Sequence, residues 1–380
     1  LVGSYMFIRD SRAGPRNSLG SSARGRTRPR RCPYGKGRCV SRSHLETYLR
    51  SFQADQRLHD FQRPIHEDLV LMQSVLRDFF LSRVGLVHEV GDHLLGMAGK
   101  RFRPALTLLI ARLGAPPAGD PVFAAAVIEL IHTATLVHDD TIDKSAMRRG
   151  LPTINALYND LVATILGDYI YTKVLVDLLD RGEDRIVRVV ARTTYEMSIG
   201  EMLQIQQKRN LGLTEGEYLE LVDAKTASLM AASCEVGAIV GGFEQERIEQ
   251  FRHFGLDLGR AYQITDDIFD YAGDAAQLGK YGQSDLAEGK VTLPLIRALA
   301  RSDGAERKRV GGILERSAQL TAEDWQFVRG LLDRTRALDE CRDTAASLAG
   351  KALARLDGPP ADPLMTGLRQ AVDYAVTRSH

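Results

Sequence analysis

Two aspartate-rich pentads constrain this chain more than any other sequence feature. They are Asp139-Asp140-Thr141-Ile142-Asp143 and Asp266-Asp267-Ile268-Phe269-Asp270, and each lies in an apolar stretch that predicts a helix. Residues four apart share one face of a helix, so each pentad presents two carboxylates in the same direction. Burying carboxylates without partners is costly, which favours two acidic helices that face each other across bound cations. Magnesium usually takes one or two carboxylates together with substrate phosphates, so the pattern predicts a phosphorylated ligand held through metal.

A solvated acidic helix face is the alternative interpretation of either pentad alone. The flanking sequence favours a site, because residues 127–138 and 256–264 are mostly apolar. Polar clusters at the ends of buried helices are typical of functional sites.

Apolar residues recur with helical spacing from about Ile65 to the end of the chain, and alternating polarity is rare. Segments rich in Gly and Pro divide this part into about ten to thirteen helices. No linker interrupts the periodic pattern. We therefore expect an all-α fold, with residues 46–380 forming a single large helical bundle.

The composition excludes several classes of protein. The net charge of +1 removes the bulk electrostatic case for a nucleic-acid partner, and 44% apolar residues are enough for a sizeable core. No stretch approaches eighteen consecutive apolar residues, so we expect no transmembrane segment. The four cysteines show no repeated metal-binding spacing and fit a cytoplasmic protein.

Residues 1–45 differ from the rest of the chain, since they are rich in Arg, Ser and Gly and contain one acidic residue. Such a segment predicts a disordered basic extension. A transit peptide is one interpretation. An upstream extension of a bacterial gene is another, because the chain begins with Leu1. A basic arm for a membrane surface or nucleic acid is the third.

Basic residues complement the acidic pentads. The segment Gly99-Lys100-Arg101-Phe102-Arg103-Pro104 places three cations where a helix is predicted to begin, which is a favourable anion site. Arg148 and Arg149 follow the first pentad, and Lys225 and Lys280 are further candidates. An ordinary solvated turn and pairing of the arginines with Asp139 or Asp143 are the alternatives. Together the groups predict a site for two polyphosphorylated ligands, one bound through metal and one by cations alone.

The order of the motifs resembles that of the trans-isoprenyl diphosphate synthases, or polyprenyl synthetases, from about Ile65 to the last residues. The shared motifs are Gly99–Pro104, the first pentad with Arg148-Arg149-Gly150, Gly167-Asp168-Tyr169, Gly200-Glu201-Met202-Leu203-Gln204, Lys225-Thr226-Ala227, residues 263–270, and residues 279–294. The resemblance implies an isoprenoid-synthase-type helical bundle around a central cavity. It also implies a homodimer that joins an allylic prenyl diphosphate to isopentenyl diphosphate.

The resemblance assigns a role to each candidate residue. Asp139, Asp143 and Asp266 would bind Mg²⁺, three ions per active site with substrate bound, while Asp140, Asp267 and Asp270 would complete or orient that shell. Arg148, Lys225 and Lys280 would contact the allylic diphosphate. Isopentenyl diphosphate would be held by Lys100, Arg103, His132 and Arg149. Thr226 and Gln263 would support the reacting carbon of the allylic substrate.

The implied reaction is a 1'-4 head-to-tail trans condensation that releases pyrophosphate. Metal and cations stabilise charge on the departing pyrophosphate, and the double bond of isopentenyl diphosphate attacks the allylic carbocation. Water must be excluded from the carbocation, which it would otherwise hydrolyse.

Small residues one helical turn before the first pentad bear on product length. Ala134 and Thr135, with Ile131 and Leu130 deeper, predict an open tunnel and a product longer than farnesyl diphosphate. A side chain from another helix or subunit would shorten it. A long product would also bring the enzyme to membranes. One departure from the family pattern is Leu157-Tyr158-Asn159-Asp160, where many relatives have a Gly-Asn pair.

Two other functions compete with this interpretation. A class I terpene cyclase would carry a different second metal motif and would not need a second diphosphate pocket. A subunit of a heteromeric prenyl diphosphate synthase would be expected to have lost aspartates or basic residues, and none is missing here.

Overall fold

The computed structural model describes residues 56–97, 99–114, 117–272, 284–358 and 362–378. All of these residues belong to one compact unit that spans residues 39–380. The predicted N-terminal extension, residues 1–45, and the candidate Lys280 lie outside the described residues.

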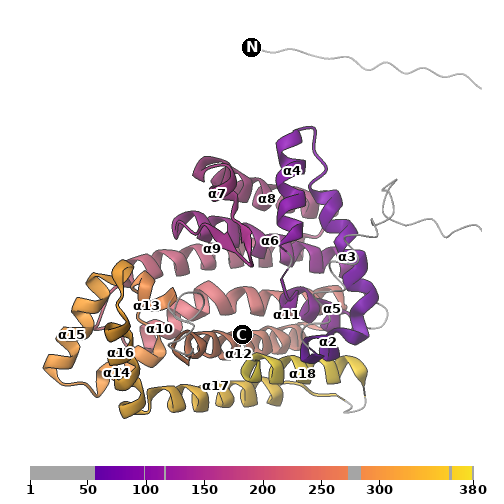
Figure 1. Ribbon diagram of the computed structural model, residues 1–380. Helices are drawn as coiled ribbons and strands as arrows, with labels where there is room; N and C mark the ends of the chain where they lie inside the picture. Colours follow the sequence, from indigo (N-terminus) through magenta and orange to yellow (C-terminus); the bar gives the residue numbers. More distant parts are fainter. Residues whose placement is uncertain (1–55, 98, 115–116, 273–283, 359–361, 379–380) are drawn as a thin grey trace, which may run out of the picture. The chain divides into compact units, whose positions relative to one another are not determined.

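The described part of the chain is helical almost throughout, which confirms the all-α prediction (Figure 1). Its α-helices are α2 Gln56–Gln62, α3 His66–Phe79, α4 Gly85–Gly96, α5 Phe102–Leu113, α6 Pro121–Ile142, α7 Ile154–Leu157, α8 Asp160–Asp180, α9 Asp184–Gln207, α10 Glu215–Val222, α11 Ser228–Val240, α12 Gln245–Ala272, α13 Ser284–Glu288, α14 Leu293–Ala300, α15 Gly304–Glu315, α16 Ala322–Thr335, α17 Ala337–Ala354 and α18 Pro363–Thr377. Two short 3₁₀ segments are η1 Arg63–Ile65 and η4 Ser317–Gln319, and a π-helical turn η2 Asp223–Ala227 joins α10 to α11. With α10 and α11 taken as one, thirteen of these helices contain eight residues or more, at the upper end of the predicted range.

A small hairpin follows the first pentad and was not predicted. Its strands are β1 Met147–Arg148 and β2 Leu151–Pro152, which pair antiparallel. Arg149 and Gly150 connect them with φ angles of 51° and 78°, and two such residues are typical of a tight hairpin turn. The turn sends the side chains of the neighbouring Arg148 and Arg149 to different partners.

The two acidic helices lie on either side of α11. Helix α6 packs against α3, α5, α8 and α11, and helix α12 packs against α11, α17 and α18. Helix α6 begins at Pro121, where the Asp120 side chain accepts hydrogen bonds of 3.1 Å from the N–H groups of Val122 and Phe123. Helix α11 therefore holds the two pentads in a fixed relation to each other.

Helix α12 links two hydrophobic clusters. Its first half packs Phe251, Phe254 and Leu258 into the larger cluster, and its second half packs Ile264 and Tyr271 into a cluster built with α10 and α14 to α17. The second pentad belongs to this second half.

Helix α6 is the one helix among the described residues that is long and apolar enough to cross a membrane. Its most apolar 18-residue window has a mean hydropathy of 1.5, and 72% of that window is buried inside the protein. Its apolar side chains therefore serve the protein core.

Candidate active site

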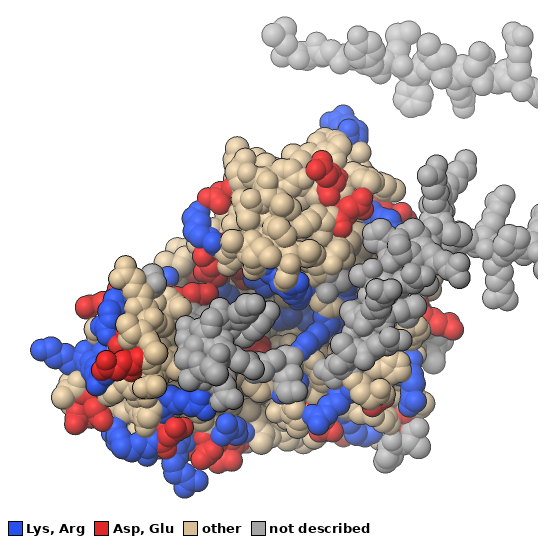
Figure 2. All heavy atoms as spheres, in the orientation of Figure 1, with Lys and Arg blue, Asp and Glu red and all other residues tan. Residues whose placement is uncertain are grey.

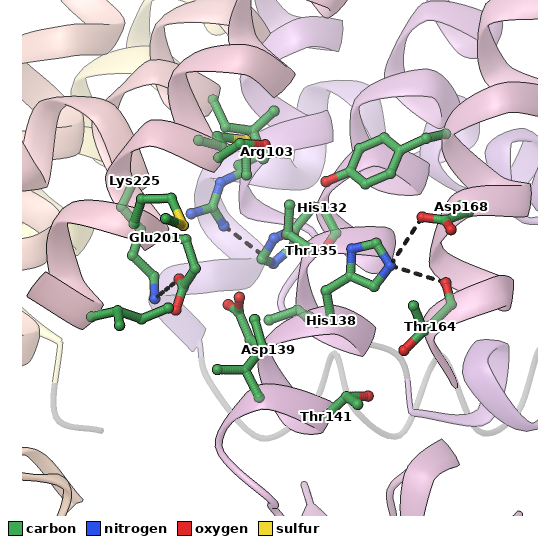
Figure 3. Close-up of a pocket in the computed structure, with 18 residues that line it drawn as sticks. Arg103, His132, Thr135, His138, Asp139, Thr141, Thr164, Asp168, Glu201 and Lys225 are labelled. Carbon is green, nitrogen blue, oxygen red and sulfur yellow. Dashed lines mark hydrogen bonds and ion pairs between the residues drawn. The ribbon is translucent and has the colours of Figure 1, made fainter. Parts of the chain in front are cut away.

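Two neighbouring cavities share part of their lining. A cavity of about 510 Å³ lies among α5, α6, α8, α9 and α11 (Figure 3). A second cavity of about 400 Å³ lies among α6, α9, α10, α12 and the segment from α13 to α14. Leu136, Asp139 and Lys225 line both cavities. Asp143 and Asp267 also line the second, so the structure brings carboxylates of both pentads to one site.

The first pentad forms the C-terminal end of α6. Asp139 faces the cavities between the pair Lys225–Glu201 and the side chain of His138 (Figure 3). Burial raises the pKa of Asp139 to about 6, with Glu201 and Asp143 adding to the effect and Lys225 and Arg148 opposing it. A cation beside a buried carboxylate stabilises the ionised form of that carboxylate.

Asp140 anchors the hairpin. It is 5% exposed, and Arg148 Nε donates to both of its carboxylate oxygens at 2.9 Å. The alternative in which Arg148 pairs with Asp139 or Asp143 is therefore wrong. Arg148 pairs instead with Asp140, which lies on the buried side of α6. Arg148 still lines the second cavity.

Asp267 of the second pentad belongs to a chain of hydrogen bonds that runs from a partly buried to a buried position. Thr226 Oγ1 donates to Gln263 Oε1, and Gln263 Nε2 donates to Asp267 Oδ1, each at 2.8 Å. The hydroxyl of Tyr218, on α10, donates to Asp267 Oδ2 at 2.5 Å. Burial raises the pKa of Asp267 to about 7, against the lowering effect of these two donors. Both oxygens are thus engaged within the protein.

Asp266 and Asp270 have partners from the C-terminal part of the chain. Arg378 Nη2 donates to Asp266 Oδ1 at 2.6 Å, while the Arg378 guanidinium lies 3.4 Å from the centre of the Tyr262 ring. Burial raises the pKa of Asp266, and Arg378 opposes that rise. A hydrogen bond joins Asp270 to Asp285, whose pKa burial raises well above its ordinary value.

These carboxylates do not form a ready-made metal cage. Among the described residues, no three Asp, Glu, His or Cys side chains are grouped closely enough to hold one metal ion. The donor set fits a hard cation that takes one or two carboxylates and completes its shell with water and phosphate oxygens. Burial is the main cause of the raised pKa of Asp139, and the neighbouring carboxylates of Glu201 and Asp143 add to it.

Basic groups gather at the start of α5. Arg103 Nη1 lies 3.3 Å from His132 Nε2. Burial lowers the pKa of His132 well below its ordinary value, and the nearby Arg103 and Arg149 add to the effect, so this imidazole is neutral. Arg149 donates to the carbonyl of Met97 at 2.7 Å and packs on Gly99, where a Cβ would lie 2.4 Å from the guanidinium. Figure 2 shows basic side chains, in blue, in a hollow at the centre of the face that it draws.

Lys100 and Arg101, the two other basic residues of the Gly99–Pro104 segment, have different surroundings. Lys100 Nζ lies 5.5 Å from the centre of the Tyr374 ring on α18. Arg101 is 5% exposed and pairs with Glu129 in the core of α6, so the expectation that it contributes to an anion site is wrong. The reason is that a buried carboxylate requires a buried partner.

Lys225 and Thr226 lie in the π-helical turn η2. Lys225 Nζ lies 2.5 Å from Oε2 of Glu201, a residue of α9. Lys225 lines both cavities. Most of the described candidates therefore line the two cavities, namely Asp139, Asp143, Asp267, Arg103, His132, Arg148, Lys225 and Gln263. Asp140, Asp270 and Thr226 hydrogen-bond to lining residues, whereas Asp266, Lys100 and Arg149 line neither cavity. Their individual roles remain predictions.

The wall of the larger cavity differs from the one expected. Thr135 lines it, whereas Ala134, Ile131 and Leu130 are at most 3% exposed and belong to the packed core of α6. Side chains from other helices take their place, namely Tyr171, Met197, Met202, Ile205 and Leu229. The departure at residues 157–160 has a local role, because Asn159 caps α8 through a 2.9 Å hydrogen bond to the N–H of Val162.

Sequence reasoning missed several residues of the site. Glu201 and Asp285 enter the sequence analysis only as members of motifs, and Tyr218 and Arg378 do not enter it. Glu201 directly follows a motif glycine and could have been found from that position. Nothing local marks Tyr218 and Arg378, since each meets the second pentad only through folding.

Comparisons with known proteins agree with this geometry. Residues 84–329 match the family model described as Polyprenyl synthetase. The chain is 34% identical over 84% of its length to the all-trans-nonaprenyl-diphosphate synthase (geranyl-diphosphate specific) of Rhodobacter capsulatus, covering 97% of that protein. It is 35% identical over 83% of its length to heptaprenyl diphosphate synthase component 2 of Geobacillus stearothermophilus, covering 97% of that protein.

Solved structures give the same result. The crystal structure of a decaprenyl diphosphate synthase from Rhodobacter capsulatus superposes with a TM-score of 0.79 at 35% identity, covering 84% of this chain and 98% of that one. A polyprenyl synthase from Caulobacter crescentus CB15, complexed with calcium and isoprenyl diphosphate, gives 0.78 at 35% identity, with the same coverage.

Proposed function

The chain belongs to the polyprenyl synthetase family, and we propose that the two cavities meeting at Asp139 and Lys225 form its active site. The protein is a trans-prenyltransferase. It condenses an allylic prenyl diphosphate with isopentenyl diphosphate, releases pyrophosphate and elongates the chain beyond farnesyl diphosphate. The metal-dependent chemistry of the family requires a cation at the acidic pentads.

Mg²⁺ is the proposed cation, with Asp139, Asp143 and Asp266 as its protein ligands and three ions bound with the substrate. Support comes from the carboxylates of both pentads on one cavity and from the calcium bound to the Caulobacter relative. When bound, the metal supplies electrostatic stabilisation of the departing pyrophosphate. Asp140, Asp267 and Asp270 orient this shell through Arg148, Tyr218 and Asp285.

Lys225 and Arg148, with Lys280, are proposed to contact the allylic diphosphate beside the metal ligands. Lys225 and Arg148 line the second cavity, and Lys225 balances the charge of Asp139. Thr226 and Gln263 form one hydrogen-bonded pair beside them and support the reacting carbon. The apolar lining of the larger cavity holds the growing chain and excludes water from the carbocation.

Isopentenyl diphosphate is proposed to bind at Lys100, Arg103, His132 and Arg149. The Arg103–His132 contact and the position of Arg149 against Gly99 support this site. A neutral His132 donates a hydrogen bond to a phosphate oxygen, while the arginines carry the compensating charge.

The observation that carries the proposal is that Asp139, from the first pentad, and Asp267, from the second, line one cavity together with Lys225. The test is to incubate purified protein with Mg²⁺, labelled isopentenyl diphosphate and geranyl, farnesyl or geranylgeranyl diphosphate, and to resolve the products by length. We expect a ladder that ends at one prenyl diphosphate longer than farnesyl. Absence of elongation with every starter would contradict the proposal, and release of a hydrocarbon from one substrate would identify a cyclase.

A homodimer is the proposed assembly. Large apolar side chains are exposed along α8 and α9, among them Leu161, Ile165, Tyr195 and Met202. Figure 2 shows a largely tan area over α7 and α8. Light scattering of the purified chain tests this, and elongation that appears only after a second protein is added would favour a heteromeric enzyme like the Geobacillus relative named component 2.

The proposed location is the cytoplasm, with membrane association through the long product. Cys234 and Cys341 are buried and free, which fits a reducing compartment. The catalytic domain is proposed to comprise residues 46–380 and to work without residues 1–45.

A further inference from the structure

The π-helical turn η2 is the one place where the long helical segment from Glu215 to Val240 departs from α geometry. It supplies Lys225 and Thr226 to the proposed site. A π turn within an α-helix is rare and is often found at functional sites. Something outside the turn must favour it over regular α-helix.

Two glycines of other helices contact this turn from different elements. A Cβ added to Gly200, in α9, would lie 2.6 Å from the backbone nitrogen of Lys225 and 2.8 Å from its Cα. A Cβ added to Gly259, in α12, would lie 2.6 Å from the Cα of Ala227. These distances are too short for a carbon atom next to backbone, so both helices approach η2 more closely than any other residue type would allow.

The helix that contains each glycine gives no reason for glycine at that position. Both lie inside helices, where glycine is less favourable than alanine, and neither has a positive φ. The close approach of two backbones is therefore what each position requires.

Polar contacts around the same turn show what the close approach achieves. Asp223, the first residue of η2, accepts 2.5 Å hydrogen bonds from the guanidinium of Arg260, which follows Gly259. Glu201, which follows Gly200, pairs with Lys225. Each glycine thus stands beside the residue that ties η2 to that helix.

We propose that Gly200 and Gly259 are positioning residues that clamp the π turn between α9 and α12 and so aim Lys225 and Thr226 at the allylic diphosphate. The inference rests on the proposed function for the identity of that ligand. A methyl group at either position must push the turn away by several tenths of an ångström. Displacements on the order of 1 Å cost about a hundredfold in rate when they misplace a catalytic group.

The test compares Gly200→Ala and Gly259→Ala with the controls Gly330→Ala and Gly350→Ala, which lie inside α16 and α17 with no atom within 4 Å of the added Cβ. We expect the clamp variants to lose about tenfold to a hundredfold in kcat/KM for the allylic diphosphate while KM for isopentenyl diphosphate changes less than about twofold. The controls should match the parent chain and melt at the same or a higher temperature.

A binding measurement separates this inference from the proposed function. Isothermal titration with inorganic pyrophosphate and Mg²⁺ should show weaker binding for Gly200→Ala, and combining it with Lys225→Ala should add little further loss. Additive losses, or a lower melting temperature with unchanged kinetic constants and pyrophosphate binding, would overturn the clamp. A parent chain that does not elongate any substrate would overturn the function instead. If a glycine variant fails to fold, Asp223→Asn, which adds no heavy atom, should give the same kinetic pattern as the remaining glycine variant, and unchanged constants would refute the clamp.

Discussion

Replacing Tyr218 by phenylalanine removes one hydroxyl that has a single buried partner. That hydroxyl donates to Asp267 Oδ2 at 2.5 Å, and both residues are 3% exposed. The ring stays in the second hydrophobic cluster, so packing is preserved. The loss is therefore that of one hydrogen bond, with Gln263 remaining as donor to the other carboxylate oxygen.

The magnitude depends on the charge of Asp267, whose pKa is about 7. At pH 8 the carboxyl group is largely ionised, and a hydrogen bond to a charged group contributes about 1.5–3 kcal/mol to the free energy of unfolding. At pH 6 it is largely protonated, and a neutral hydrogen bond contributes about 0.5–1.5 kcal/mol. Because folding raises the pKa of Asp267 from 3.8 to about 7, the stability linked to its protonation is fully present below about pH 3.8. That stability is lost as the pH rises through about 7. Removing the hydroxyl raises this pKa further, so Tyr218→Phe should destabilise more at pH 8 than at pH 6.

Urea denaturation followed by circular dichroism at both pH values measures this difference. Tyr158→Phe is the matched control, because its hydroxyl donates to Glu89 at 2.7 Å at the surface, and we expect unchanged stability. The catalytic consequence should be a lower kcat with little change in KM for isopentenyl diphosphate, since the network reaches Thr226 through Gln263. An equal loss at both pH values, or a larger one at pH 6, would refute the reasoning.

Four further outcomes are expected. Asp139→Ala or Asp266→Ala should lower turnover by orders of magnitude with helicity intact by circular dichroism; near-normal turnover would exclude the metal-ligand assignment. Lys100→Ala should raise KM for isopentenyl diphosphate more than KM for the allylic substrate, and the reverse order would mean that the two sites are exchanged. His132→Gln should make melting temperatures less sensitive to acid below about pH 6.5, because an imidazole whose folded pKa is lowered costs stability as the unfolded chain takes up a proton; an unchanged pH profile would contradict a neutral His132. Deleting residues 1–45 should leave steady-state activity unchanged, whereas loss of folding would show that they belong to the domain.

Much of the site could be predicted because its pattern is local. The spacing of Asp139 and Asp143 on one helical face, and the apolar residues before them, follow from helix geometry alone. The same holds for the start of α5 at the predicted basic segment, with Arg103 and Pro104 in its first turn. A hairpin of two-residue strands could not be predicted, since its only local signal is Arg149-Gly150 in the turn.

The partners of the charged residues were not predictable from local pattern. Arg101 is the N-cap residue of α5 and Arg103 lies two positions further on in its first turn, yet Arg101 neutralises Glu129 in the core and Arg103 contacts His132. Arg378, near the end of the chain, pairs with Asp266 from a distance of 112 positions in sequence. Side chains from four other helices, rather than Ala134 and Ile131, complete the cavity wall around Thr135.

By itself the sequence determined which side chains share a helix face, and therefore the all-α fold, the two acidic helices and the family to which the chain belongs. Only the tertiary structure decided which charges meet, which remain directed into the cavities, and how closely α9 and α12 approach the turn that carries Lys225. The physical reason is that helix periodicity acts over a few residues. Neutralisation of buried charge and contact between backbones depend on groups that the packing brings together from distant parts of the chain.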